Sequence, residues 1–145
     1  MTSMGKRPPA PQVPAANAGD GAPGPGHRVV VLRSAPAGPP LLAQCLNAHP
    51  ELVVPDETDF IIPTAFLIDR IPDPVLGRRL VTELICGSAR YADSIGRYLP
   101  PDRVREVVDL AEYTVPGVIV SLYNEVARAA GVRVAGDKSP HDLQF

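Results

Sequence analysis

The stretch HRVVVLRS at residues 27–34 decides the fold, and AGDKSP at residues 135–140 follows the same pattern. In each, a short apolar run ends in a cation and a hydroxyl side chain. A continuous β-branched apolar run is typical of a parallel strand that is buried on both faces. Open α/β sheets bind their ligands at the carboxyl ends of such strands. The two stretches therefore predict a nucleotide or phosphate site at the edge of a parallel sheet.

The composition limits the class of protein. The 145 residues allow one domain, and a net charge of -2 argues against nucleic-acid binding, which usually needs a basic domain. Cys45 and Cys86 lack CxxC spacing and lie in apolar segments, so we expect buried free thiols and no metal site. No apolar run approaches the ~20 residues of a membrane span. Residues 1–26 lack the apolar core of a secretory signal, so we expect a cytoplasmic protein.

The chain divides into a tail and one domain. Residues 1–26 are rich in Pro, Gly and Ala, which predicts a disordered tail, and residues 27–145 form an α/β domain. Strands are expected at residues 29–32, 52–54 and 132–135. Helices are expected at residues 41–46, at 57–71 with an interruption near Pro63, at 101–113, and at 116–130 with Gly131 as the C-cap. Residues 74–99 are expected to form either one long helix or two shorter helices that Gly87 separates. Strand, helix, helical insertion and strand form the front half of an α/β nucleotide-binding layout.

The first strand leads into a candidate anion site. A turn and a helix N-terminus follow it, and these provide free backbone N–H groups and a positive dipole end. Arg33 adds a planar fork suited to phosphate, and Ser34 adds a hydroxyl. The same residues also fit an ordinary strand-to-helix loop with a surface arginine.

Two further segments carry candidate catalytic groups. Glu57, in PDETDF at residues 55–60, is a candidate general base near the end of the sheet. Alternatively, Asp56 or Thr58 caps a helix there. Lys138 either points its cation into the site or is a solvent-exposed turn lysine.

Four short motifs occur in a fixed order along the chain. They are RS at residues 33–34 with Gly38 and LL at 41–42, then LNAHP at 46–50, PDETDF at 55–60 and GDKSP at 136–140. In this order they resemble the N-terminal half of the PAPS-dependent sulfotransferase family, above all its bacterial and tyrosylprotein-sulfotransferase-like branches. The matching family motifs are PRSGTTLL, LxxHP, PxETxF and G[ED]K[TS]P. The resemblance covers about residues 28–145.

The resemblance implies a P-loop-like parallel sheet flanked by helices, incomplete and with a helical insertion, that binds 3'-phosphoadenosine 5'-phosphosulfate (PAPS). By similarity, Arg33, Ser34 and Gly38 lie at the phosphosulfate loop. Glu57 deprotonates a hydroxyl of a small-molecule or peptide acceptor, and Lys138 steadies the charge on the transferring sulfuryl group. In such in-line transfer, positioning and charge stabilisation dominate.

The chain departs from the family at its loop and at its end. APAGPP at residues 35–40 contains Pro36, Pro39 and Pro40, which have no N–H to donate to an anion. Phe145 comes before the segment in which the family carries its 3'-phosphate ligands. We therefore expect either a sulfotransferase that works with a further C-terminal half or by self-association, or a non-catalytic remnant that serves as an interaction module. A P-loop NTPase would need Gly-Lys-Ser/Thr after the first strand, where this chain has none.

Overall fold

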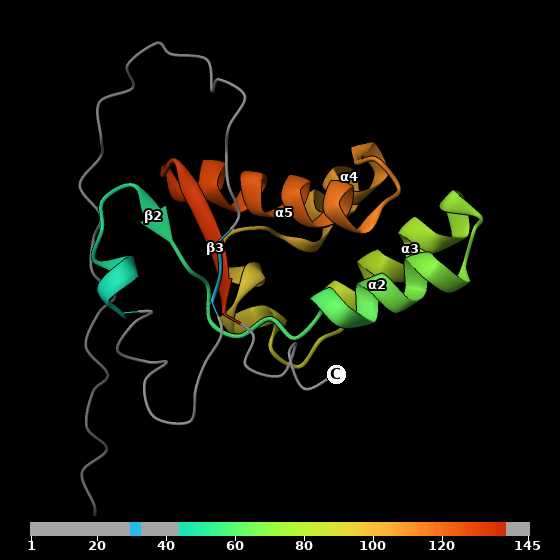
Figure 1. Cartoon of the computed structure of the whole chain (residues 1–145), viewed down its shortest axis with the longest axis horizontal. Coiled ribbons are helices and arrows are strands. Elements are labelled where there is room, and N and C mark those ends of the chain that lie inside the picture. Colours follow the sequence, from blue (N-terminus) through green and yellow to red (C-terminus); the bar gives the residue numbers. More distant parts are fainter. Residues whose placement is uncertain (1–29, 33–43, 139–145) are drawn as a thin grey trace, which may run out of the picture.

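The computed structural model describes residues 30–32 and 44–138 of the chain (Figure 1). This part is mixed α/β, mostly helical, with one small parallel sheet. The strands are β1 (Val30–Leu32), β2 (Leu52–Val53) and β3 (Val134–Lys138). The helices are α2 (Ile61–Arg70), α3 (Pro74–Cys86), α4 (Pro101–Leu110) and α5 (Val115–Ala130), and two 3-10 turns, Tyr91–Asp93 and Ile95–Arg97, separate α3 from α4.

The sheet has the strand order β1-β3-β2, and both pairings are parallel. Leu32 pairs with Lys138, and Leu52 pairs with Val134. The three strands expected from the sequence are therefore confirmed, but the third is displaced toward the C-terminus. It runs to Lys138, so Gly136 and Asp137 belong to the strand and not to the loop after it.

The helices lie together beside the sheet, with α5 along β3 and with α2 and α3 reaching farthest from it (Figure 1). Helix α4 packs between α3 and α5, because its valines form one apolar stripe. Fully buried side chains from α3, α4 and α5 meet in the core. They include Val81, Ile85, Val104, Val108, Val118, Leu122 and Val126.

Helix ends follow ordinary capping chemistry. Asp73 accepts a hydrogen bond from the Val75 N–H at 3.0 Å, and Thr114 accepts one from the Gly117 N–H at 3.1 Å. Gly131 closes α5 with φ of 69°, a left-handed conformation that glycine adopts at little cost. The C-cap expected there is confirmed.

Three expectations about helices need correction. Helix α2 begins at Ile61, not at Glu57, and Pro63 does not interrupt it, because in the first turn its missing N–H costs no intrahelical bond. Phe60 occupies the N-cap position without a side-chain hydrogen bond, so neither Asp56 nor Thr58 caps this helix. The break at Gly87 is confirmed, but 3-10 turns and not a second helix lead on toward Leu99.

The cysteines also differ from expectation. Both are free thiols, but Cys45 is exposed, because the helical turn at residues 44–47 turns it outward, and Cys86 is only half-buried. Among the described residues, no group of histidine, cysteine and acidic side chains is suited to hold a metal ion. None of the described helices is long and apolar enough to cross a membrane.

Candidate active site

The segment after β2 reaches the carboxyl end of β3. Asn47 fixes its start, because its side chain donates to the Val54 carbonyl at 2.9 Å and accepts from the Val54 N–H at 2.6 Å. These bonds replace the strand pairing that β2 loses after Val53. Residues 54–60 then run without regular structure to the start of α2. This path brings Glu57 to the end of the sheet.

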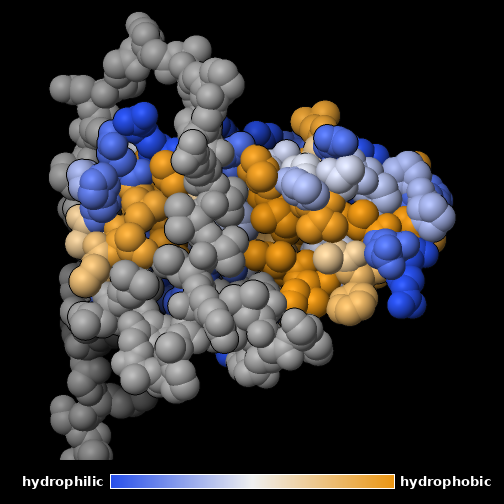
Figure 2. All heavy atoms as spheres, viewed as in Figure 1, coloured by the Kyte–Doolittle hydropathy of each residue, from blue (hydrophilic) through white to orange (hydrophobic). Residues whose placement is uncertain are grey.

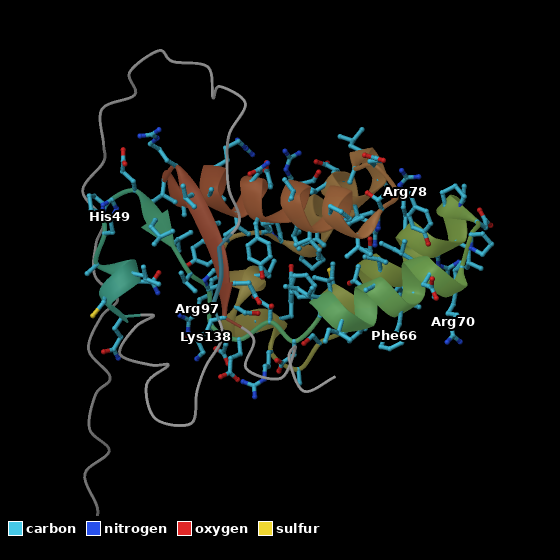
Figure 3. The ribbon with its side chains drawn as sticks, in the orientation of Figure 1. His49, Phe66, Arg70, Arg78, Arg97 and Lys138 are labelled. Carbon is cyan, nitrogen blue, oxygen red and sulfur yellow. The ribbon has the colours of Figure 1, made fainter. Side chains whose placement is uncertain are left out.

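Glu57 and Lys138 meet there. Glu57 Oε1 lies 3.2 Å from Lys138 Nζ, and the two side chains are only 21% and 15% exposed. Lys138 is the last residue of β3, and its side chain lies at the end of that strand (Figure 3). The structure thus brings together the two candidate catalytic residues chosen from the sequence. Lys138 is not the solvent-exposed turn lysine that was the alternative.

Arg90 closes the other side of Glu57. Its guanidinium lies 3.1 Å from Glu57 Oε2 and 2.9 Å from Asp59 Oδ2. Arg97 adds a looser contact to Asp56 at 3.6 Å. We call these six side chains the sheet-edge cluster: Asp56, Glu57, Asp59, Arg90, Arg97 and Lys138.

Sequence reasoning missed Arg90 and Asp59. Arg90 lies in the turn after α3, and only tertiary packing carries it to the sheet. Asp59 has φ of 52°, a left-handed conformation that aspartate tolerates better than most residues. No spacing in the sequence signals either role.

A buried hydrogen-bond network lies beneath the cluster. Thr58 Oγ1 donates to Asp137 Oδ1 at 2.5 Å, and the Tyr123 hydroxyl donates to the same oxygen. Thr58 and Tyr123 also lie within 3.3 Å of each other, and all three side chains are at most 1% exposed. A carboxylate so deep in the protein needs such donors. The sequence analysis did not predict this network, because it placed Asp137 in the loop after the third strand and not within the strand.

The residues of the predicted phosphosulfate loop, Arg33, Ser34 and Gly38, lie outside the described residues. The register still locates the point where that loop begins. Leu32 pairs with Lys138, and Arg33 follows Leu32 in the sequence. Leu32, the last described residue before that loop, therefore lies beside Lys138.

A hollow lies between α3 and α4. It has a volume of about 670 Å³, and its walls include Arg79, Glu83, Cys86 and Arg105. Both arginines have local partners, since Arg79 pairs with Glu83 at 3.9 Å and Arg105 pairs with Asp102 at 3.3 Å. Burial raises the pKa of the Cys86 thiol, which makes it a poor nucleophile. The sheet-edge cluster is the better candidate for chemistry.

The cluster can serve two chemical purposes. The Glu57 carboxylate can accept a proton, and the cations beside it can hold an anion near that base. Comparison of the chain with protein-family models, with curated proteins and with solved structures finds no match. The case for a function therefore rests on this geometry and on the motifs of the sequence.

Proposed function

We propose that this chain is a sulfotransferase-like protein, which transfers a sulfuryl group from PAPS to an acceptor hydroxyl. The observation that carries the proposal is the contact of the Glu57 carboxylate with the Lys138 ammonium at the carboxyl end of β3. A base and a cation at one strand end are what in-line transfer of a charged group requires.

In the proposed reaction, the acceptor oxygen attacks the sulfur of PAPS. The bond from sulfur to the bridging oxygen breaks, and its electron pair leaves with the 5'-phosphate. The acceptor proton passes to Glu57, and the products are a sulfate ester and 3'-phosphoadenosine 5'-phosphate. Lys138 stabilises the negative charge that develops at the bridging oxygen.

Glu57 must exchange one ion pair for the acceptor hydroxyl before it can act. Its Oε1 faces Lys138, whose side chain is 15% exposed, whereas its Oε2 faces Arg90, whose side chain is 51% exposed. The more exposed pair is the easier one to open, because solvent screens it more strongly. The acceptor therefore approaches from the Arg90 side, and Lys138 stays with the donor.

The strand order supports a P-loop-like arrangement of this domain. The first strand lies directly beside the strand that carries Lys138, although most of the described chain separates them in sequence. The loop that follows Leu32 and contains Arg33, Ser34 and Gly38 is the binding segment that we assign to the phosphosulfate, by resemblance.

The test is transfer of radiolabelled sulfuryl from PAPS by the full chain to a set of acceptors: a phenol, a carbohydrate and a tyrosine peptide. Glu57→Gln should lower the transfer rate at least ~100-fold, the usual contribution of a general base. Glu51→Gln is the matched control, since the Glu51 side chain is 51% exposed and its ion pair, with Arg133 at 3.3 Å, lies outside the sheet-edge cluster. Equal rates for Glu57→Gln and the wild type would overturn the proposed role of Glu57.

A non-catalytic interaction module is the second candidate. Large apolar side chains are exposed on the described part, including Phe66 at 57%, Val75 at 79% and Leu110 at 86%, and apolar groups reach the surface in Figure 2. Replacing residues 35–40 with Gly-Thr-Thr separates the two candidates. Transfer that appears only after this repair favours the module, and transfer by the unmodified chain excludes it.

A further inference from the structure

We propose that Asp137 is a positioning residue, which sets Glu57 against Lys138 through its hydrogen bonds to Thr58 and Tyr123. This inference rests on the proposed function for its catalytic meaning, because it names the device that orients the same site. Asp137 itself lies beneath the site and is 0% exposed, so it acts through its neighbours.

Two contacts, one hydrogen bond and one ion pair, join two pairs of adjacent residues. Thr58 directly follows Glu57, and Asp137 directly precedes Lys138. The hydroxyl of Thr58 lies 2.5 Å from Asp137 Oδ1, while Glu57 Oε1 lies 3.2 Å from Lys138 Nζ. The buried bond therefore holds the two backbones in the register that the ion pair needs.

Tyr123 connects these two contacts to the helices. Its hydroxyl donates to Asp137, and its ring stacks on Phe60 with centroids 6.3 Å apart. Phe60 immediately precedes α2, and Tyr123 belongs to α5. The segment that carries Glu57 is thus held at Thr58 and again at Phe60.

The arrangement fits positioning better than stabilisation. Both hydroxyls converge on Oδ1, while the buried Oδ2 has no hydrogen-bond partner among the described residues. A buried carboxylate that is incompletely bonded is a poor source of stability, because apolar residues can fill such a place at lower cost. The hydrogen bonds from Thr58 and Tyr123 are directional and come from two separate parts of the chain. They therefore fix the position of Asp137 more narrowly than apolar packing would.

The experiment measures the geometry without requiring sulfuryl transfer. The chain has two lysines, Lys6 and Lys138, so acylation by acetic anhydride followed by mass spectrometry gives the reactivity of Lys138 relative to Lys6. Asp137→Asn, Thr58→Val and Tyr123→Phe should each raise the relative reactivity of Lys138, by roughly fivefold for the full loss of one ion pair. Glu57→Gln defines that full effect, and Thr58→Ser should retain the wild-type value.

The matched control is Glu125→Gln. Glu125 lies in α5, as Tyr123 does, and the substitution breaks its ion pair with Arg103 at 2.7 Å. It should leave the reactivity of Lys138 unchanged. Variants are compared at temperatures where circular dichroism shows them folded. If Asp137→Asn fails to fold, Thr58→Val and Tyr123→Phe carry the test.

The outcomes separate this inference from the proposed function. Raised Lys138 reactivity in a chain that transfers no sulfuryl group supports the positioning role and contradicts the enzyme. In a chain that transfers, Asp137→Asn should lower kcat at least ~10-fold with a smaller change in KM for PAPS. Unchanged Lys138 reactivity in the folded variants overturns the inference, whether or not transfer occurs.

Discussion

The Lys138 ammonium lies 3.2 Å from the Glu57 carboxylate, and this contact joins the end of β3 to the segment that leads into α2. Both side chains are mostly shielded from solvent, and Arg90 engages the second oxygen of Glu57 at 3.1 Å. The carboxylate thus lies between a sheltered cation and a more exposed one. Such an asymmetric environment suits a general base that must give up its ion pair with Arg90 to bind the acceptor and keep its ion pair with Lys138 on the donor side.

Glu125 should make stability depend on pH. Hydrogen bonds from Arg128 and then from Arg103 lower its pKa to about 2. A lowered pKa adds stability that is fully present above the unfolded value of 4.5 and is lost as the pH falls toward 2. We expect Glu125→Gln to cost about 1–2 kcal/mol at pH 7, since solvent screens the exposed arginines.

Urea denaturation at pH 7, 4 and 2.5 checks this expectation. The difference between wild type and Glu125→Gln should shrink steadily across that series. Glu106→Gln serves as the control, because the Glu106 side chain is 60% exposed. A difference that is as large at pH 2.5 as at pH 7 would show that ionisation of Glu125 does not stabilise the fold.

Gly77 should not tolerate alanine, although alanine normally favours a helix interior. A Cβ atom at Gly77 would lie 1.7 Å from the Tyr113 hydroxyl, which donates to the Ile71 carbonyl at 2.8 Å. The clash should lower the free energy of unfolding by about 1–3 kcal/mol, where helix propensity alone would raise it by ~1 kcal/mol.

Thermal unfolding of a double-mutant cycle tests the cause. In a Tyr113→Ala background the clash is absent, so Gly77→Ala should then be neutral or stabilising. The same loss in both backgrounds would mean that the Tyr113 contact is not responsible.

The phenol of Tyr91 should ionise at a higher pH than an ordinary tyrosine does. Its hydroxyl donates to the Leu99 carbonyl at 2.5 Å, and burial, followed by the neighbouring Cys86, raises its pKa to about 12. The neutral phenol is the favoured form, so its contribution to stability is complete below pH 10 and is lost as the pH rises toward 12.

Absorbance titration at ~295 nm should show one phenol ionising near pH 12, and Tyr91→Phe should remove that component. A Tyr91→Phe curve that still contains the late component would assign it to another of the tyrosines.

Much of this arrangement follows from the sequence, and the rest depends on tertiary packing. The β-branched run before Leu32 and the glycine at position 131 specify a strand and a helix end by local physics alone. The meeting of Glu57 with Lys138 follows from the rule that parallel strand ends share one edge.

Thr58 shows where local reasoning fails. Its position ahead of an apolar run is that of a helix cap, but its hydroxyl bonds instead with Asp137, 79 residues away. Whether a side chain bonds with a local or a distant partner depends on the geometry of the whole fold, and the spacing of residues in the sequence does not specify that geometry. Arg90 reaches Glu57 for the same reason, since only the packing of α3 against its neighbours brings that turn to the sheet.

Calorimetric titration of the full chain with PAPS, in the absence of acceptor, tests whether the Glu57–Lys138 site receives an activated sulfate. We expect measurable binding by the wild type and at least ~10-fold weaker binding by Lys138→Ala, because a charge-assisted contact contributes about 1.5–3 kcal/mol. Arg133→Ala removes a cation whose side chain is 74% exposed, and it should bind PAPS as the wild type does. Absence of binding at millimolar PAPS, or equal affinity in Lys138→Ala and the wild type, would contradict a sulfuryl-transfer site at this edge of the sheet.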